Sequence, residues 1–275
     1  IAVIMVGSSL LVLQVHVWVW SEPAFLLFSL AGALLLSWHL LRPRLSLVVA
    51  ASAAVALASL TRYAGMALIP AFFGVLIFAG SGSAAKRVRD ICVSALFTCA
   101  PLAAWMARNA LVSGSATTST PGWYPLQWAH ARALVKAGAY LVCPVSDLPR
   151  VLSGPTFLLT LLFMGYVLVV WVRSRLARRL QGGSASIFPA ISTLFAIAVL
   201  GFTYFTLAFY YANIELTPRM YTPTFFLLLN AGAAAFFVVD KDAKTGWFTP
   251  FLGIFVGVAV VLNLVQSVAF APLSD

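Results

Sequence analysis

The chain has 275 residues, of which 62% are apolar and only 9% carry a charge. A soluble domain of average composition carries about 25% charged residues, so the composition excludes an ordinary soluble enzyme and indicates an integral membrane protein. The formal net charge of +10 does not indicate binding to nucleic acid. Most of the basic residues fall in short segments between apolar runs, where membrane topology places them.

Apolar runs of about the length that crosses a bilayer, roughly 20 residues, recur from one end of the chain to the other. Because the bilayer core offers the backbone no water to bond with, each run is expected to be an α-helix. We therefore predict an all-α, polytopic transmembrane helix bundle that forms a single transmembrane domain over residues 1–275. Its nine predicted spans are residues 1–20, 24–41, 45–61, 64–80, 90–107, 155–172, 187–211, 223–239 and 247–270.

Alternation of these spans distributes the basic residues unequally between the two sides of the membrane. The loops after the second, fourth, sixth and eighth spans hold 11 of the 17 Lys and Arg residues, and the other side holds six. Cytoplasmic loops of membrane proteins are enriched in basic residues. The loops with 11 basic residues are therefore predicted to face the cytoplasm.

The longest connection between spans, residues 108–154, lies on the predicted outer side. It contains a Ser/Thr/Gly-rich stretch over 113–120, then Trp123 and Trp128, and a helix-like stretch over about 128–142. Connections of this length are usually functional or disordered. The aromatic residues favour a position along the membrane surface.

Glu22 lies between two long apolar runs, in the sequence Trp20-Ser21-Glu22-Pro23, and is one of only two glutamates in the chain. An acidic side chain is costly where a span meets water, which makes Glu22 a candidate functional residue. An alternative interpretation is that Ser-Glu-Pro starts a helix, with Glu22 favoured by the positive end of the helix dipole.

Other polar residues mark the outer ends of later spans. Arginine pairs bidentately with phosphate, and a carboxylate can orient a hydroxyl, act as a base or bind a divalent cation. These residues could therefore bind an anionic lipid head group, although interfacial arginines also bind ordinary lipid. The candidates are Arg62, Tyr63, Arg108, Asn109, Glu215, Arg219 and Tyr221.

Motifs of soluble enzymes, such as a phosphate-binding glycine loop, HExxH or GxSxG, do not occur in the sequence. The three histidines, His16, His39 and His130, are far apart in the sequence. A lone histidine is more often a packed or interfacial residue than a ligand, and this interpretation is favoured for each of the three.

Taken in order, four segments resemble the C-type (GT-C) glycosyltransferases, polytopic enzymes that use polyprenyl-phosphate sugars as donors. The resemblance is greatest to the bacterial branch of protein mannosyltransferases and lipid A aminoarabinose transferases. It extends over about 200 residues, and each segment lies at the predicted outer face. The segments are Ser21-Glu22-Pro23, Arg62-Tyr63-Ala64-Gly65, Trp105-Met106-Ala107-Arg108-Asn109 with Gly114, and Arg219-Met220-Tyr221-Thr222-Pro223.

This resemblance implies a cell-envelope enzyme of the bacterial inner (plasma) membrane, a hexosyltransferase-like glycosyltransferase with its active face outward. It would transfer a sugar to a lipid, glycan or protein acceptor. Arg219, Arg62 and Arg108 would hold the donor phosphate, and Glu22 would be the second acidic residue, which supports a catalytic aspartate or a divalent metal ion. That aspartate is expected upstream of Ile1, so we interpret the chain as a fragment that is inactive by itself.

Two other functions remain open at this point. A transporter or flippase of lipid-linked precursors would use the same arginines, but no predicted span has an acidic or basic residue in its interior. This absence favours chemistry at one face over passage through the middle. An O-antigen-ligase-like enzyme would use His130 and Arg132 in the long outer connection, and only one such pair is present.

Overall fold

The computed structural model describes residues 21–80, 82–114, 122–134, 187–210 and 218–240. Within these ranges every regular element is helical and no strand occurs, which confirms the all-α prediction for the described residues. The predicted spans over 1–20, 155–172 and 247–270 lie outside them. In chain order the elements are α3 (Glu22–Leu41), α4 (Leu45–Thr61), the 3-10 helix η1 (Tyr63–Ala67), α5 (Leu68–Ala79), α6 (Ala84–Ser113), α9 (Ile187–Phe209) and α10 (Pro218–Asp240).

The chain divides into two compact units. Helices α3 to α9 belong to the unit formed by Ser21–Gln127 and Ile187–Glu215, which we call the main unit. Helix α10 and residues 128–134 belong to the other unit. Among the described helices, α3, α6 and α9 are long and apolar enough to cross a bilayer, which indicates an integral membrane protein.

Helix α6 is longer than the predicted span over 90–107. Lys86 and Arg89 were predicted to lie in a loop, but they lie in its first turns, where the Ser83 hydroxyl accepts a hydrogen bond from the Lys86 backbone N–H at 3.4 Å. At the other end the helix continues to Gly114, which has a φ of 73° in the left-handed region. Its 30 residues extend about 45 Å, more than the ~30 Å bilayer core. The predicted span ends where the apolar run ends, whereas the helix continues beyond that run in both directions.

Helix α10 also begins earlier than predicted. Its first residue is Pro218, so Arg219 and Tyr221 lie in its first turns and not in a loop before residue 223. Proline suits the first position of a helix because the N–H it lacks has no partner there. The following arginine therefore has a helical backbone.

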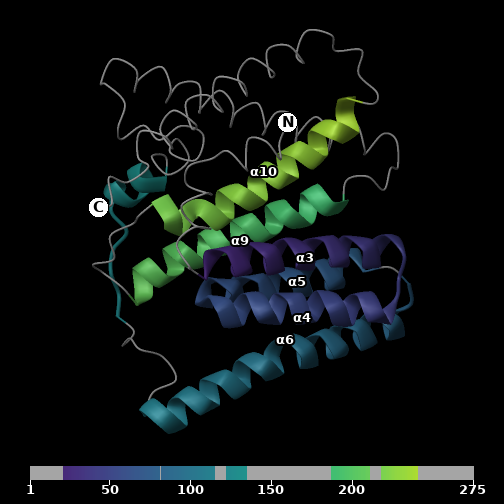
Figure 1. The fold of residues 1–275 in the computed structure, drawn as a ribbon, viewed down its shortest axis with the longest axis horizontal. Helices are drawn as coiled ribbons and strands as arrows, with labels where there is room; N and C mark the ends of the chain where they lie inside the picture. Colours follow the sequence, from purple (N-terminus) through teal and green to yellow (C-terminus); the bar gives the residue numbers. More distant parts are fainter. Residues whose placement is uncertain (1–20, 81, 115–121, 135–186, 211–217, 241–275) are drawn as a thin grey trace, which may run out of the picture. The chain divides into compact units, whose positions relative to one another are not determined.

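Helices α3 and α4 form an antiparallel hairpin whose close packing depends on small residues (Figure 1). A Cβ atom added to Gly32 of α3 would lie 3.1 Å from Val55 Cγ2 of α4. Ala51 and Ala58 of α4 are fully buried. Small residues let membrane helices approach closely, and that contact replaces the hydrophobic effect as the driving force. The hairpin is therefore the centre of the main unit.

The buried side of α6 is polar, which is unusual for a helix of a soluble protein. Its buried residues are Asp90, Ser94, Thr98 and Leu102, spaced four apart along one face. The Ser94 and Thr98 hydroxyls donate to backbone carbonyls four residues earlier, each at 2.7 Å. Large apolar residues such as Leu96 are exposed. This polarity fits a helix whose outer side faces lipid.

The described part of the long connection contacts the end of α9. The backbone N–H groups of Gly122 and Tyr124 donate to the carbonyls of Phe209 and Ala208, each at 2.7 Å. The rings of Trp123 and Phe209 meet edge to face with centroids 5.1 Å apart. The exposed Trp123 is typical of the aromatic belt where a membrane meets water.

Gly65 fixes the turn between α4 and α5. Its N–H donates to the Arg62 carbonyl at 2.8 Å. A Cβ atom at this position would lie 2.6 Å from the carbonyl carbon and oxygen of Ala58, which are backbone atoms of α4. Any larger residue would therefore push η1 away from the last turn of α4.

We predict that Gly65→Ala lowers the melting temperature by several degrees, because overpacking against backbone costs about 1–3 kcal/mol. The matched control is Gly74→Ala, since a Cβ atom there meets nothing within 4 Å. Thermal unfolding of the purified protein in detergent, followed by tryptophan fluorescence, compares the two variants. An equal melting temperature for both would contradict the close approach at Gly65.

Candidate functional site

Glu22 and Arg62, singled out separately in the sequence, form an ion pair. Glu22 is the first residue of α3 and Arg62 follows the last residue of α4. Since the two helices are antiparallel, these residues come to the same end of the hairpin. The Nη1 atom of Arg62 contacts the Oε1 atom of Glu22. The side chain of Glu22 is 3% exposed and that of Arg62 is 20% exposed.

Glu22 does more than start its helix. The preceding Ser21 makes no side-chain capping hydrogen bond, so the Ser-Glu-Pro sequence does not work as an ordinary hydroxyl cap. Glu22 lies in the first turn, where the positive end of the helix dipole stabilises a carboxylate. The Arg62 guanidinium adds a second positive group in direct contact. The buried Glu22 carboxyl therefore has both a helix N-terminus and a guanidinium beside it.

The pair leaves Arg62 able to bind a further acceptor. A guanidinium has five N–H donors in a planar fork, and it is the Nη1 group that faces Glu22. The Arg62 side chain as a whole is 20% exposed, whereas its Nη1 atom is buried. The pair is neutral as a whole, so binding of an anion here would depend mainly on directed hydrogen bonds.

Tyr63, Arg108 and Asn109 lie outside this pair. Tyr63 follows Arg62 in η1 and is exposed. Arg108 lies on α6, where its Cζ atom is 5.3 Å from the ring centroid of Trp105 and its Nη1 donates to Asn109 Oδ1 at 3.4 Å. A cation over an indole ring is typical of interfacial positions. Arg108 therefore contacts its own helix and not the Glu22–Arg62 pair.

The remaining predicted residues belong elsewhere. Tyr221 lies on α10, in the other compact unit, and is buried. Arg219 lies on the same helix. Glu215 is outside the described residues. Convergence of Arg219 with Glu22 and Arg62 at one site stays a prediction.

A second buried pair of ionisable side chains lies at the opposite end of α3 and was missed in the sequence. His39 Nε2 is 3.3 Å from Asp90 Oδ2 on α6, and the two side chains are 2% and 7% exposed. Arg89 contacts Asp90 Oδ1 through Nε at 3.0 Å and Nη2 at 2.8 Å. The other ring nitrogen of His39, Nδ1, lies 3.2 Å from the carbonyl oxygen of Arg44.

The two partners of the His39 ring fix its hydrogen bonding. A carbonyl oxygen only accepts, so Nδ1 carries the proton in its bond to Arg44. The other ring nitrogen, Nε2, meets the Oδ2 atom of Asp90. His39 thereby joins α3, the loop to α4 and α6. The signal in the sequence was weak: a histidine and an aspartate, each at the end of a predicted span on the same side.

A metal site is not formed by the described residues, where no three His, Cys, Asp or Glu side chains gather. Glu22 faces a guanidinium, which supplies the positive charge that a cation would bring. The residues that surround Glu22 therefore do not fit a divalent ion held by the described part of the chain.

The fold and these contacts define the class of the protein: an α-helical integral membrane protein with a pair of ionisable side chains at each end of helix α3. Comparison of the chain with protein-family models, with curated proteins and with solved structures finds no match in any of the three. The resemblance to C-type glycosyltransferases therefore depends on the sequence motifs alone.

We predict that Glu22 and Arg62 are energetically coupled. Removing one partner of a buried ion pair leaves the other charge without a partner and costs about 3 kcal/mol of stability. The cost is smaller here, because Arg62 is partly exposed. Glu22→Gln and Arg62→Gln should each destabilise the protein, and the double variant should cost less than their sum by about 0.5–3 kcal/mol.

Unfolding by SDS titration in mixed micelles measures the three free energies of unfolding. Arg108→Gln is the control, because this exposed arginine contacts only its own helix. Strict additivity of the Glu22 and Arg62 effects would show that the pair contributes no interaction energy.

Proposed function

We propose that this protein transfers a sugar from a polyprenyl-phosphate donor to an acceptor at the outer face of a membrane. The observation that supports the proposal is the buried Glu22–Arg62 pair at one end of the α3–α4 hairpin. It joins two of the four segments that resemble the C-type glycosyltransferases. An ionised pair at the end of membrane-spanning helices is costly, and such groups are commonly kept for function.

In this proposal Arg62 binds the phosphate of the donor and Glu22 is a positioning residue. The carboxylate holds one edge of the guanidinium fork, which leaves other N–H groups directed at the lipid phosphate. During transfer, the bond between the sugar anomeric carbon and the phosphate oxygen breaks, and its electron pair goes to the phosphate. An arginine N–H group that already points at the phosphate stabilises this negative charge without having to reorient.

The acceptor supplies the other half of the reaction. Its hydroxyl oxygen forms the new bond to the anomeric carbon as a base takes the hydroxyl proton. Glu22 is a poor candidate for that base, because its carboxyl group is buried and already engaged by the Arg62 guanidinium. A separate aspartate, which the resemblance implies, would take the proton.

The alternative, a transporter of lipid-linked precursors, needs polar groups along a path through the membrane. In α3 no charged residue lies between Glu22 and His39, and in α6 none lies between Asp90 and Arg108. Ionisable residues in the middle of spans mark ion and substrate pathways. Their absence from these two helices favours chemistry at one end.

The test uses the full-length product of the gene in proteoliposomes with a panel of polyprenyl-phosphate sugars. We expect release of polyprenyl phosphate together with loss of the sugar from the donor. Arg62→Gln should lower this turnover by about 100-fold, the usual effect of losing one donor to a developing anion. Glu22→Gln should lower it less, since the guanidinium loses its orientation and keeps its charge.

Arg132→Gln is the matched control, because Arg132 is exposed and lies outside the main unit. Movement of a fluorescent donor between leaflets, measured with a membrane-impermeant quencher, reports on transport. Transport without sugar release would favour the flippase. Turnover unchanged in Arg62→Gln would remove this arginine from the site.

A further inference from the structure

The end of the main unit that carries His39 has basic residues with no acidic partner. Arg42, Arg44, Lys86 and Arg87 are all exposed, and none forms an ion pair within the described part of the chain. The nearby acid, Asp90, is buried, and both of its oxygens are engaged by His39 and Arg89. This end therefore has a concentrated positive charge that the described residues do not neutralise.

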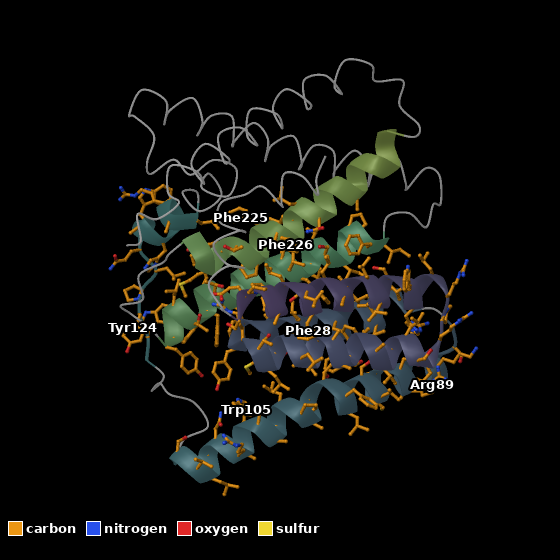
Figure 2. The ribbon with its side chains drawn as sticks, viewed as in Figure 1. Phe28, Arg89, Trp105, Tyr124, Phe225 and Phe226 are labelled. Atoms are coloured by element: carbon orange, nitrogen blue, oxygen red, sulfur yellow. The ribbon has the colours of Figure 1, made fainter. Side chains whose placement is uncertain are left out.

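The His39–Asp90 pair brings the basic residues of two segments together. The Arg44 carbonyl meets one nitrogen of the His39 ring, and Asp90 meets the other. Arg89, beside Asp90 in the sequence, contacts the same carboxylate. The loop 42–44 and the first turns of α6 are thus held side by side. Figure 2 shows several nitrogen-tipped side chains at the end of the unit where Arg89 is labelled.

Exposed apolar side chains adjoin these charges on the same helices. Trp38 and Leu41 precede Arg42 on α3, Leu45 follows Arg44, and Val88 lies between Arg87 and Arg89. A small soluble anion has no apolar chains that could cover these exposed side chains. A phospholipid has both parts, since its phosphate can meet the arginines while its acyl chains lie along the apolar residues.

We propose that the loop 42–44 and residues 86–89 form a binding site for the phosphate group of an anionic diacyl phospholipid, such as phosphatidylglycerol. The site lies at the end opposite Glu22 and Arg62, which topology predicts to face the cytoplasm. It is independent of the proposed sugar transfer. The His39–Asp90 pair is its positioning element, because it sets the spacing of the two basic segments.

Native mass spectrometry of the detergent-purified protein, mixed with equal amounts of phosphatidylglycerol and phosphatidylcholine, tests the proposal. We expect preferential retention of phosphatidylglycerol. Arg44→Gln and Arg87→Gln should each weaken it about fivefold, the usual contribution of one basic residue near an anionic lipid. Arg132→Gln removes the same charge from another part of the chain and should leave retention unchanged.

Asp90→Asn separates a built site from a general attraction of positive charge. The substitution makes the protein more basic, so an attraction that depends on net charge alone should increase. The proposed site should instead retain less phosphatidylglycerol, because His39 and Arg89 lose their shared partner. Increased retention in Asp90→Asn, equal losses in all three arginine variants, or equal retention of the two lipids would each overturn the proposal.

Discussion

The α3–α4 hairpin depends on one constraint: an ionisable side chain buried at the end of a membrane-spanning helix must have a partner. Glu22 meets Arg62 at one end of α3, and His39 meets Asp90 at the other. Between the pairs, α3 has no charged residue and packs through Gly32 against α4. About 17 residues separate the two pairs, or ~25 Å along the helix, which is close to the thickness of a bilayer core.

The two pairs connect different elements. Glu22 and Arg62 link the two helices of the hairpin, because Glu22 is the first residue of α3 and Arg62 directly follows α4. His39 and Asp90 join the hairpin to α6, whose buried side is otherwise lined by Ser94 and Thr98. Those two hydroxyls bond to their own helix and give α6 little specificity for its neighbour. The position of α6 along the hairpin therefore depends strongly on Asp90.

Sequence reasoning predicted the helical class and most of the described helices, because apolar length and period are local properties. It also selected Glu22 and Arg62, since each is a rare polar residue beside a span. It placed the ends of α6 wrongly, because hydropathy predicts which residues lie in the bilayer core, whereas the hydrogen bonds of the helix continue beyond that core. It missed the His39–Asp90 pair, whose two residues are 51 positions apart in the sequence (90 − 39) and leave no local pattern. Contacts between distant segments of this kind require coordinates.

The charge states of the two ends imply different modes of anion recognition. At the Glu22 end the cation is already neutralised, so a ligand must be recognised by the direction of the remaining Arg62 N–H groups. At the His39 end, Asp90 is shielded inside the unit and Arg42, Arg44, Lys86 and Arg87 face outward without acidic partners in the described chain. Attraction there is long-ranged and sensitive to salt. A neutral, directional site suits a ligand that must be bound and released at each turnover, whereas an uncompensated positive surface suits a lipid that stays bound.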